Sequence, residues 1–344
     1  MRIPAKLLGL AGLVFLAGCA SLSKLATAVS EAAASAAANP DNVPHGEVRG
    51  DAFYSSALGV RKHLMVYLPP SYAQDTTRRF PVAFCLHGLS GSETDWLSRA
   101  GIEHIADSLF ARGVPETIIV LPDGDDGWYV NWADPASYRV CADTARTESV
   151  ERYCVQHGRY DDYVASDVVT YVASRYRTID DRAHRGIGGL SMGGYGALIV
   201  ALKHPETFAA AASHSGVASP MYAGPAEFTP PARYATSVDQ LKTGGGGFWS
   251  RYLHVFGTDL ERWRTNDPAR VVERLAGRRG RVPALFIDCG TEDALVGQSR
   301  ALHWELGRLG ITHTYAEWSG AHTWRYWNAH VPESLAWLAR RIGG

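Results

Sequence analysis

Residues 189–194 read GLSMGG, and they indicate more about the fold than any other segment of the chain. A run of mostly small residues at 183–189 precedes it and predicts a buried strand, while the run at 195–202 predicts a helix. A serine on so tight a strand-to-helix turn has a strained backbone. Glycines at 189 and 193 keep side chains out of the crowded space beside it. The pattern therefore predicts that Ser191 is a nucleophile at the edge of an α/β sheet.

A serine alone is a weak nucleophile, so a carboxylate and then a histidine are expected further along the chain. Two strand-like runs, 282–290 and 312–318, each end in a polar loop; the first loop carries Asp293 and the second carries His322. Loops after the carboxyl ends of parallel strands meet at one edge of the sheet. We therefore predict His322 as the base and Asp293 as the acid that orients its imidazole.

Other residues compete for both roles. Asp288 falls within the predicted strand, where a structural ion pair is the alternative, and Glu292 precedes the position expected for the acid. His322 is favoured among 13 histidines because it lies in a glycine-containing loop after the last strand, whereas two of its rivals fall on helical patterns. The competing histidines are His303, His313 and His330.

An oxyanion hole requires two backbone amides where negative charge develops. The amide of Met192, which follows the serine, is the first candidate. The second is expected in the loop 87–92, which follows the apolar strand predicted at 80–86. We predict Leu89 as this donor, with Gly88 as the alternative.

Five blocks of the chain carry a family resemblance. They are HGLSGSETDW at 87–96, PDGDDGWYVNW at 122–132, GLSMGGYGA at 189–197, DCGTEDALV at 288–296 and GAHTWRYW at 320–327. In this order they resemble the esterase D group of α/β-hydrolases. That group includes S-formylglutathione hydrolases, feruloyl and acetyl esterases, and mycolyltransferases of the antigen 85 type.

The resemblance implies an α/β-hydrolase fold, with a mostly parallel central sheet and helices on both faces. It implies that Trp128 and Tyr129 line the acyl or alcohol pocket. It also supports the triad and the oxyanion donors named above. The aspartates at 123–126 lack the spacing of an EF-hand loop, so we expect a solvated turn there.

Composition agrees with one sizeable α/β domain. The chain has 344 residues, is 46% hydrophobic and carries a formal charge of −1. No basic stripe is present, which argues against a nucleic-acid partner, and we expect neither a metal nor a cofactor. The further predicted strands are 63–68, 117–121 and 208–214, and the predicted helices are 101–112, 160–176, 297–309 and 332–342.

The N-terminus reads as an export signal. Two positive charges precede an apolar stretch, and residues 16–19 read LAGC, which resembles a bacterial lipobox. We predict a signal peptide over 1–18, lipidation of Cys19, and an Ala/Ser-rich tether over 19–45. Ordinary cleavage near Ala20 is the alternative. Ala20 itself resembles lipoproteins sent to the outer membrane, so we expect attachment there, facing the periplasm.

The catalytic domain is predicted over 46–344, with a lid-like insertion at about 219–247 that is rich in proline and glycine. In an oxidising compartment Cys141 and Cys154 are candidates for a disulfide. Cys85 and Cys289 lie in or at the end of apolar runs and are expected to be buried thiols.

These features predict an exported, membrane-anchored serine carboxylesterase that cleaves small-molecule esters through an acyl-enzyme. The alternatives are an acyltransferase with the same triad, a thioesterase like S-formylglutathione hydrolase, and a non-catalytic lipoprotein that binds ligands. The oligomeric state is not determined by the sequence.

Overall fold

The computed structural model describes residues 43–134, 155–245, 249–276 and 282–344. His45–Gly344 form one compact unit, and Met1–Pro44 are grouped apart from it. Three predicted features lie outside the described residues: the signal peptide, lipidation at Cys19, and the disulfide between Cys141 and Cys154. Within the described ranges, no helix combines the length and apolar character needed to cross a membrane.

A single eight-stranded sheet forms the centre of this unit, in the order β1-β2-β4-β3-β5-β6-β7-β8. The first two strands run antiparallel to their neighbours, and all pairs from β4 to β8 are parallel. The strands are β1 (Glu47–Ser55), β2 (Val60–Leu68), β3 (Val82–Leu86), β4 (Ile118–Pro122), β5 (Arg185–Leu190), β6 (Ala210–His214), β7 (Ala284–Gly290) and β8 (Thr314–Trp318).

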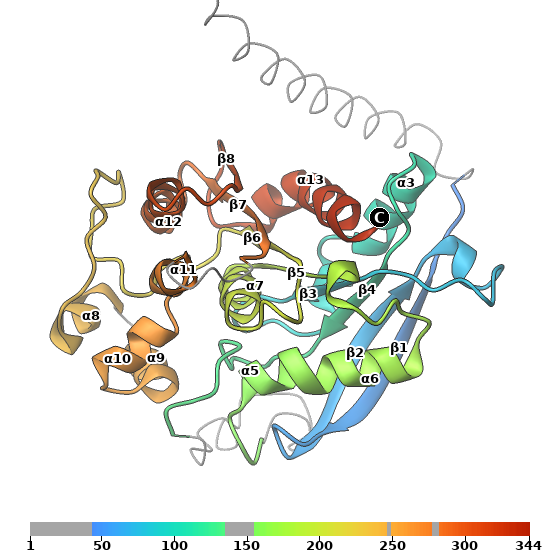
Figure 1. Ribbon diagram of the computed structural model, residues 1–344, viewed down its shortest axis with the longest axis horizontal. Coiled ribbons are helices and arrows are strands. Elements are labelled where there is room, and N and C mark those ends of the chain that lie inside the picture. The colour runs from blue at the N-terminus through green and yellow to red at the C-terminus, as the bar shows by residue number, and fades with distance from the viewer. Residues whose placement is uncertain (1–42, 135–154, 246–248, 277–281) are drawn as a thin grey trace, which may run out of the picture. The chain divides into compact units, whose positions relative to one another are not determined.

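Helices cover both faces of the sheet (Figure 1). The longer ones are α3 (Ile102–Ala111), α6 (Val169–Arg175), α7 (Met192–Lys203), α8 (Val238–Gly245), α9 (Trp249–Phe256), α11 (Pro268–Ala276), α12 (Val296–Arg308) and α13 (Trp324–Ile342). The shorter ones are η2 (Pro70–Tyr72), α2 (Asp95–Ser98), α5 (Tyr160–Asp162), η4 (Tyr163–Val168), η5 (Arg182–His184) and α10 (Leu260–Thr265).

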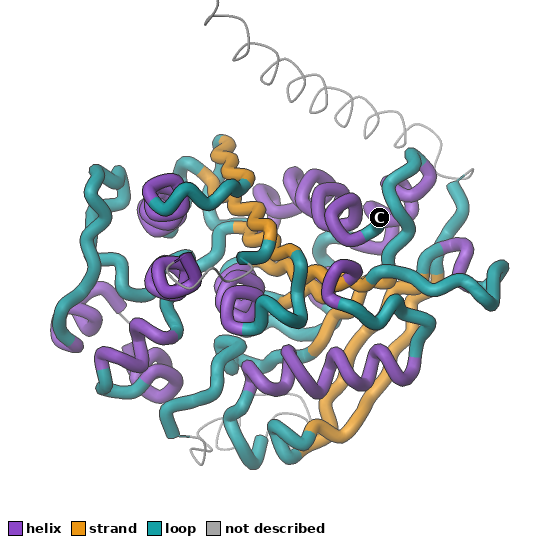
Figure 2. The backbone as a smooth tube through the Cα atoms, in the orientation of Figure 1, coloured by secondary structure: helices purple, strands orange, loops and turns teal. Residues whose placement is uncertain are grey.

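The helices α3 and α13 pack together on one side of the sheet, and α7 with α11 lies on the other (Figure 1). Figure 2 shows the strands passing between these two groups. The central strand β5 is buried on both faces, as its apolar and glycine-rich sequence requires. The expected mostly parallel sheet with helices on both faces is therefore confirmed.

The structure adds elements that the sequence pattern did not indicate. Strand β1 was not predicted, because its exposed polar positions hide its pairing with β2. Helix α13 begins at Trp324 rather than at Pro332, which lies inside it. The segment after β6 is a loop as far as residue 237, but then forms α8 to α11. The lid-like insertion expected at about 219–247 therefore contains α8.

The turn between β5 and α7 depends on close packing against the end of β3. A Cβ added at Gly193 would come 2.6 Å from the carbonyl oxygen of His87 and closer still to that of Leu86. These are backbone atoms, so the turn cannot relax by moving a side chain. A glycine at this position lets the first turn of α7 approach the neighbouring strand.

We expect Gly193→Ala to destabilise the protein by at least about 1–3 kcal/mol, since the added methyl group overpacks a rigid backbone contact. The matched control is Gly307→Ala in α12, where an added Cβ meets nothing within 4 Å. That change should instead stabilise the protein by about 0.4–1 kcal/mol. Urea unfolding midpoints measure both. Equal midpoints for the two variants would contradict this account.

Candidate active site

Ser191 lies between the end of β5 and the start of α7 with φ 54° and ψ −117°. Few L-residues adopt this conformation, so the neighbouring hydrogen bonds must hold it. The Ser191 amide donates to the carbonyl of His214 on β6 at 2.9 Å, and its carbonyl accepts from the amide of Tyr195 at 3.0 Å. The predicted strained turn is thus present, with the hydroxyl at the carboxyl edge of the sheet.

The structure brings Ser191, His322 and Asp293 together. His322 Nε2 is 2.8 Å from Ser191 Oγ, and His322 Nδ1 is 2.8 Å from Asp293 Oδ2. In the tautomer that satisfies both contacts, Nδ1–H donates to the carboxylate and Nε2 accepts from the serine hydroxyl. The arrangement can therefore withdraw a proton from Ser191.

The carboxylate of Asp293 is fully buried, and both of its oxygens accept hydrogen bonds from the protein. Its other oxygen accepts a hydrogen bond from the amide of Leu295 at 2.9 Å. Burial by itself raises the pKa of Asp293, but the hydrogen bonds and the charge of His322 outweigh it, so the pKa lies below its ordinary value. Asp293 is therefore ionised at neutral pH and stabilises a protonated His322.

Ser215 is a contributor that sequence reasoning missed. It lies just beyond β6 with φ 45°, is fully buried, and its hydroxyl also donates to Asp293, which helps to lower the pKa of that carboxyl. Its amide donates to the carbonyl of Asp288 at 2.8 Å. Only the register between β6 and β7 brings it to this carboxylate, and no motif signals that register.

The two competing carboxylates have other partners. Asp288 is fully buried at the end of β7, where one oxygen lies 2.6 Å from His214 Nδ1 and the other accepts from the Tyr326 hydroxyl at 2.9 Å. Glu292 accepts from the amide of Gly320, which ties its loop to the loop that carries His322. Both carboxylates therefore support the site without contacting His322.

The competing histidines are also engaged elsewhere. His303 and His313 contact each other at 2.7 Å, and His330 stacks on Trp318 with ring centroids 4.0 Å apart. Cys85 and Cys289 are buried free thiols, as expected, and burial raises the pKa of each to about 12. These thiols are therefore protonated and unreactive at neutral pH.

The loop that carries Leu89 is held rigidly beside Ser191. The buried His87 places Nδ1 2.8 Å from the carbonyl of Gly88, and its Nε2 accepts from the amide of Gly124 at 2.9 Å. A nitrogen that accepts a hydrogen bond is not protonated, so His87 is neutral and donates through Nδ1. The amide of Ser90 is fixed in turn by Asp126 at 2.6 Å.

Leu89 and Ser191 line the same cleft, and Met192 is the first residue of α7. Across the described ranges, neither the Leu89 amide nor the Met192 amide donates a hydrogen bond within the protein. Both stay predicted oxyanion donors.

A buried charge cluster lies behind this loop. Lys62 on β2 is fully buried, and its Nζ is 2.6 Å from Asp123 Oδ2 and 2.9 Å from Asp125 Oδ2. Tyr160 donates to the same oxygen of Asp125 at 2.7 Å. The expectation of a solvated turn at 123–126 is therefore wrong for these two carboxylates, because the loop folds inward over the lysine.

The pKa values of the two carboxylates in this cluster shift in opposite directions. Burial and the charge of Asp123 raise the pKa of Asp125 to about 6, although Lys62 and Tyr160 oppose the shift. Burial also disfavours ionised Asp123, but the charge of Lys62 and its hydrogen bond outweigh this and lower the pKa of Asp123. Asp123 is thus the carboxylate most firmly paired with the lysine, and its loop supplies the amide that binds His87.

Trp128 and Tyr129 occupy different places. Trp128 lines the cleft that contains Ser191. Tyr129 is fully buried, and its hydroxyl donates to the carbonyl of His87 at 3.0 Å. An added Cβ at Gly196 of α7 would strike its ring, so Tyr129 packs behind the site. The prediction that Tyr129 lines the pocket is wrong for this reason, since the turn sends the two neighbouring side chains in different directions.

One group of side chains has the makeup of a metal site. The ligand atoms of His45, His104 and Asp107 lie within 4.8 Å of one another. Asp107 already accepts from Tyr67 at 2.6 Å and from the amide of Gly46 at 2.8 Å, which accounts for its burial. None of the three lines the cleft of Ser191.

A strained serine between a parallel strand and a helix, with histidine and aspartate from later loops, defines an α/β-hydrolase. Residues 55–338 match the family model described as "Putative esterase", and the chain belongs to this family. It is an enzyme that hydrolyses carboxylic esters.

Individual relatives agree with this family. The chain is 25% identical over 298 residues to an acetyl esterase of Caldicellulosiruptor saccharolyticus, with 84% of this chain and 96% of the relative covered. It is 28% identical over 289 residues to the esterase Rv1288 of Mycobacterium tuberculosis, with 79% of this chain and 55% of that protein covered.

Solved structures share the fold. A ferulic acid esterase superposes with a TM-score of 0.62 at 24% identity, covering 88% of this chain and 100% of that one. An S-formylglutathione hydrolase from Staphylococcus aureus gives a TM-score of 0.60 at 21% identity, covering 86% of this chain and 99% of that one.

We expect Lys62→Met to destabilise the protein by roughly 3–5 kcal/mol, because it removes the ammonium group that two buried carboxylates face. Arg264→Met is the control: Arg264 pairs with Glu261 at 3.4 Å on an exposed surface, and its loss should change stability by less than about 1 kcal/mol. Urea unfolding at neutral pH measures both free energies. Similar small losses for the two variants would show that the buried cluster is not structural.

Proposed function

We propose that this enzyme is a serine carboxylesterase in which Ser191 is the nucleophile, His322 the general base and Asp293 the orienting acid. The observation that carries the proposal is the continuous chain of contacts from Ser191 Oγ through both ring nitrogens of His322 to the buried carboxylate of Asp293.

The reaction follows from this geometry. His322 Nε2 takes the hydroxyl proton as Ser191 Oγ attacks the ester carbonyl, and the amides of Leu89 and Met192 stabilise the resulting oxyanion. The imidazolium then gives its proton to the leaving alcohol, which leaves an acyl-serine. Water attacks the acyl group, His322 accepts its proton, and the carboxylic acid departs as the proton returns to Ser191.

The cleft around Ser191 has a volume of about 900 Å³ and mixes polar and aromatic walls. It has room for a small-molecule ester, and pockets of roughly this size enclose drug-sized ligands. An acyl-enzyme could also pass its acyl group to an alcohol acceptor. Product analysis with and without added acceptor distinguishes hydrolysis from acyl transfer, and hydrolysis is the proposed outcome.

We expect Ser191→Ala and His322→Ala each to lower kcat by ~10⁶-fold, because the members of a triad act as one unit. The double variant should be little worse than either single one. Turnover of p-nitrophenyl acetate, corrected for host esterases, measures the loss. A fluorophosphonate probe should label the wild type and not Ser191→Ala. Labelling that persists in Ser191→Ala would move the nucleophile elsewhere.

Asparagine substitutions at the two buried aspartates, Asp293 and Asp288, should have different effects. Asp293→Asn should lower kcat by ~10⁴-fold, since an amide favours the wrong tautomer of His322. Asp288→Asn keeps the triad contacts and should chiefly lower the free energy of unfolding. An inactive Asp288→Asn beside an active, folded Asp293→Asn would reverse the assignment of the acid.

We further propose that the enzyme is exported and held on a membrane through lipid attached to Cys19, at the outer membrane facing the periplasm. The support is the LAGC sequence at 16–19, the apolar run before it and the Ala/Ser-rich stretch after it. Several acyl chains, at about 0.8 kcal/mol per buried CH₂, would anchor the protein stably.

We expect Cys19→Ser to abolish incorporation of radiolabelled palmitate and either to accumulate the precursor or to release the enzyme from membranes. A chain that starts near residue 45 should hydrolyse soluble esters as fast as the full protein. Membrane fractionation and esterase assays measure the two effects. Unchanged fractionation and labelling of Cys19→Ser would rule out the anchor.

A further inference from the structure

A second chamber adjoins the catalytic cleft. Its volume is about 830 Å³, and most of its walls come from the segment between β6 and β7. Four residues line both the chamber and the cleft that contains Ser191: Trp128, Val217, Tyr252 and Gln298. The two spaces are therefore neighbours across a shared wall, and Trp128 is the largest side chain in it.

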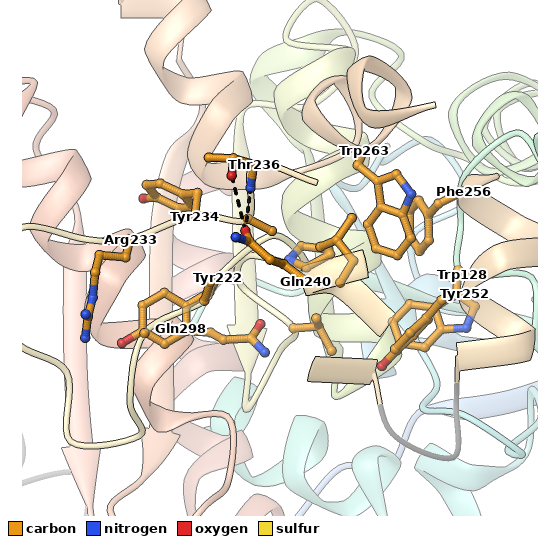
Figure 3. Close-up of a pocket in the computed structure, with 16 residues that line it drawn as sticks. Trp128, Tyr222, Arg233, Tyr234, Thr236, Gln240, Tyr252, Phe256, Trp263 and Gln298 are labelled. Atoms are coloured by element: carbon orange, nitrogen blue, oxygen red, sulfur yellow. Dashed lines mark hydrogen bonds between the residues drawn. The ribbon is translucent and has the colours of Figure 1, made fainter. Parts of the chain in front are cut away.

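The chamber is aromatic at one end and mixed in character at the other. Figure 3 shows Trp128, Tyr252, Phe256 and Trp263 grouped on one side. Their rings pack edge to face or tilted, with centroids 5.1 Å apart for Trp128 and Tyr252 and 4.6 Å apart for Phe256 and Trp263. Such walls favour another ring, which can add offset or edge-to-face contacts.

Polar groups occupy the opposite end. Arg233, Tyr222 and Tyr234 lie there in Figure 3, and the Gln240 side chain accepts from the amide of Thr236 at 2.8 Å. Among the described lining residues there is no carboxylate. A cationic ligand would therefore find no counter-charge among these residues, whereas a neutral, largely apolar group is compatible with both ends.

The position of His322 indicates which part of an ester points toward the chamber. His322 must protonate the leaving oxygen, so the alcohol lies on its side of Ser191. There the His322 ring packs against Trp327 at 5.0 Å, and Trp327 packs against Trp324. Trp128 packs instead against Tyr195 of α7 at 5.7 Å. The acyl group, which projects away from the leaving alcohol, is the part directed toward the shared wall.

We propose that this chamber is a binding subsite for the far end of the acyl group, and that it selects extended acyl chains ending in an apolar ring. The proposal rests on the esterase function proposed above. The cleft alone is large enough for a short or directly attached aryl acyl group, so the chamber adds selectivity only for substrates that reach past Trp128.

The test compares p-nitrophenyl esters of one alcohol with four acids: acetate, phenylacetate, decanoate and ω-phenylhexanoate. The wild type should give its highest kcat/KM with ω-phenylhexanoate. Ala235, which is buried in the chamber wall and does not line the cleft, is replaced by tryptophan. Ala235→Trp should lower the ratio of kcat/KM for ω-phenylhexanoate to that for acetate by about tenfold or more.

Two further variants keep the result interpretable. Ala223→Trp fills the chamber from an exposed position and serves if Ala235→Trp fails to fold. Ala226→Trp adds the same bulk to the same segment outside both spaces and should leave the ratio unchanged. For a matched series of acetate esters with alcohols of increasing size, the dependence of kcat/KM on alcohol size should be the same in all variants.

The outcomes separate the two proposals. The subsite proposal is overturned if folded Ala235→Trp or Ala223→Trp leaves the ratio of kcat/KM for ω-phenylhexanoate to that for acetate unchanged. It is also overturned if only the series of alcohols responds to these variants. A wild type that hydrolyses acetate and takes the fluorophosphonate label, yet prefers acetate to ω-phenylhexanoate, also overturns it while the esterase proposal stands. Absence of both hydrolysis and labelling would count against the esterase proposal itself.

Discussion

The backbone of Ser191 is the constraint on which the rest of the site depends. Its φ of 54° places the hydroxyl at the edge of the sheet and the first amide of α7 beside it. No side chain could hold this conformation alone. Hydrogen bonds to β6 and to α7, and the close approach of Gly193 to the end of β3, hold it from three sides. The strain is therefore supported by buried strands of the sheet.

Parallel pairing brings the other participants to the same edge. Because β3, β5, β6, β7 and β8 all run in one direction, the loops after them meet, and each contributes one group to the candidate site. These groups are the loop of Leu89, the Ser191 hydroxyl, the Ser215 hydroxyl, the carboxylate of Asp293 and the imidazole of His322. The antiparallel strand β2 contributes differently, since Lys62 acts from inside the core by holding the loop after β4.

The segment between β6 and β7 forms most of the chamber beside the catalytic cleft. The triad and its supporting hydrogen bonds lie on the sheet, whereas the aromatic chamber is built mostly from this segment and shares a wall with the cleft. Relatives at 25% and 28% identity are also esterases. The acyl subsite proposed here rests instead on side chains such as Trp128 and Tyr252, which line both spaces and lie outside the triad.

The amino-acid sequence was enough to predict the class of fold, the order of most strands and helices, the tight turn at Ser191, and the loops that carry Asp293 and His322. It could do so because each depends on local spacing: small residues at a tight turn, apolar runs, and polar residues directly after them. Only the tertiary structure sets the inward packing of Tyr129, the pairing of Lys62 with Asp123 and Asp125, and the contact of Ser215 with Asp293. It also sets the chamber that residues of α8, α9 and α10 line. These features arise from register and from burial between residues far apart in the chain, and no local pattern encodes such distances.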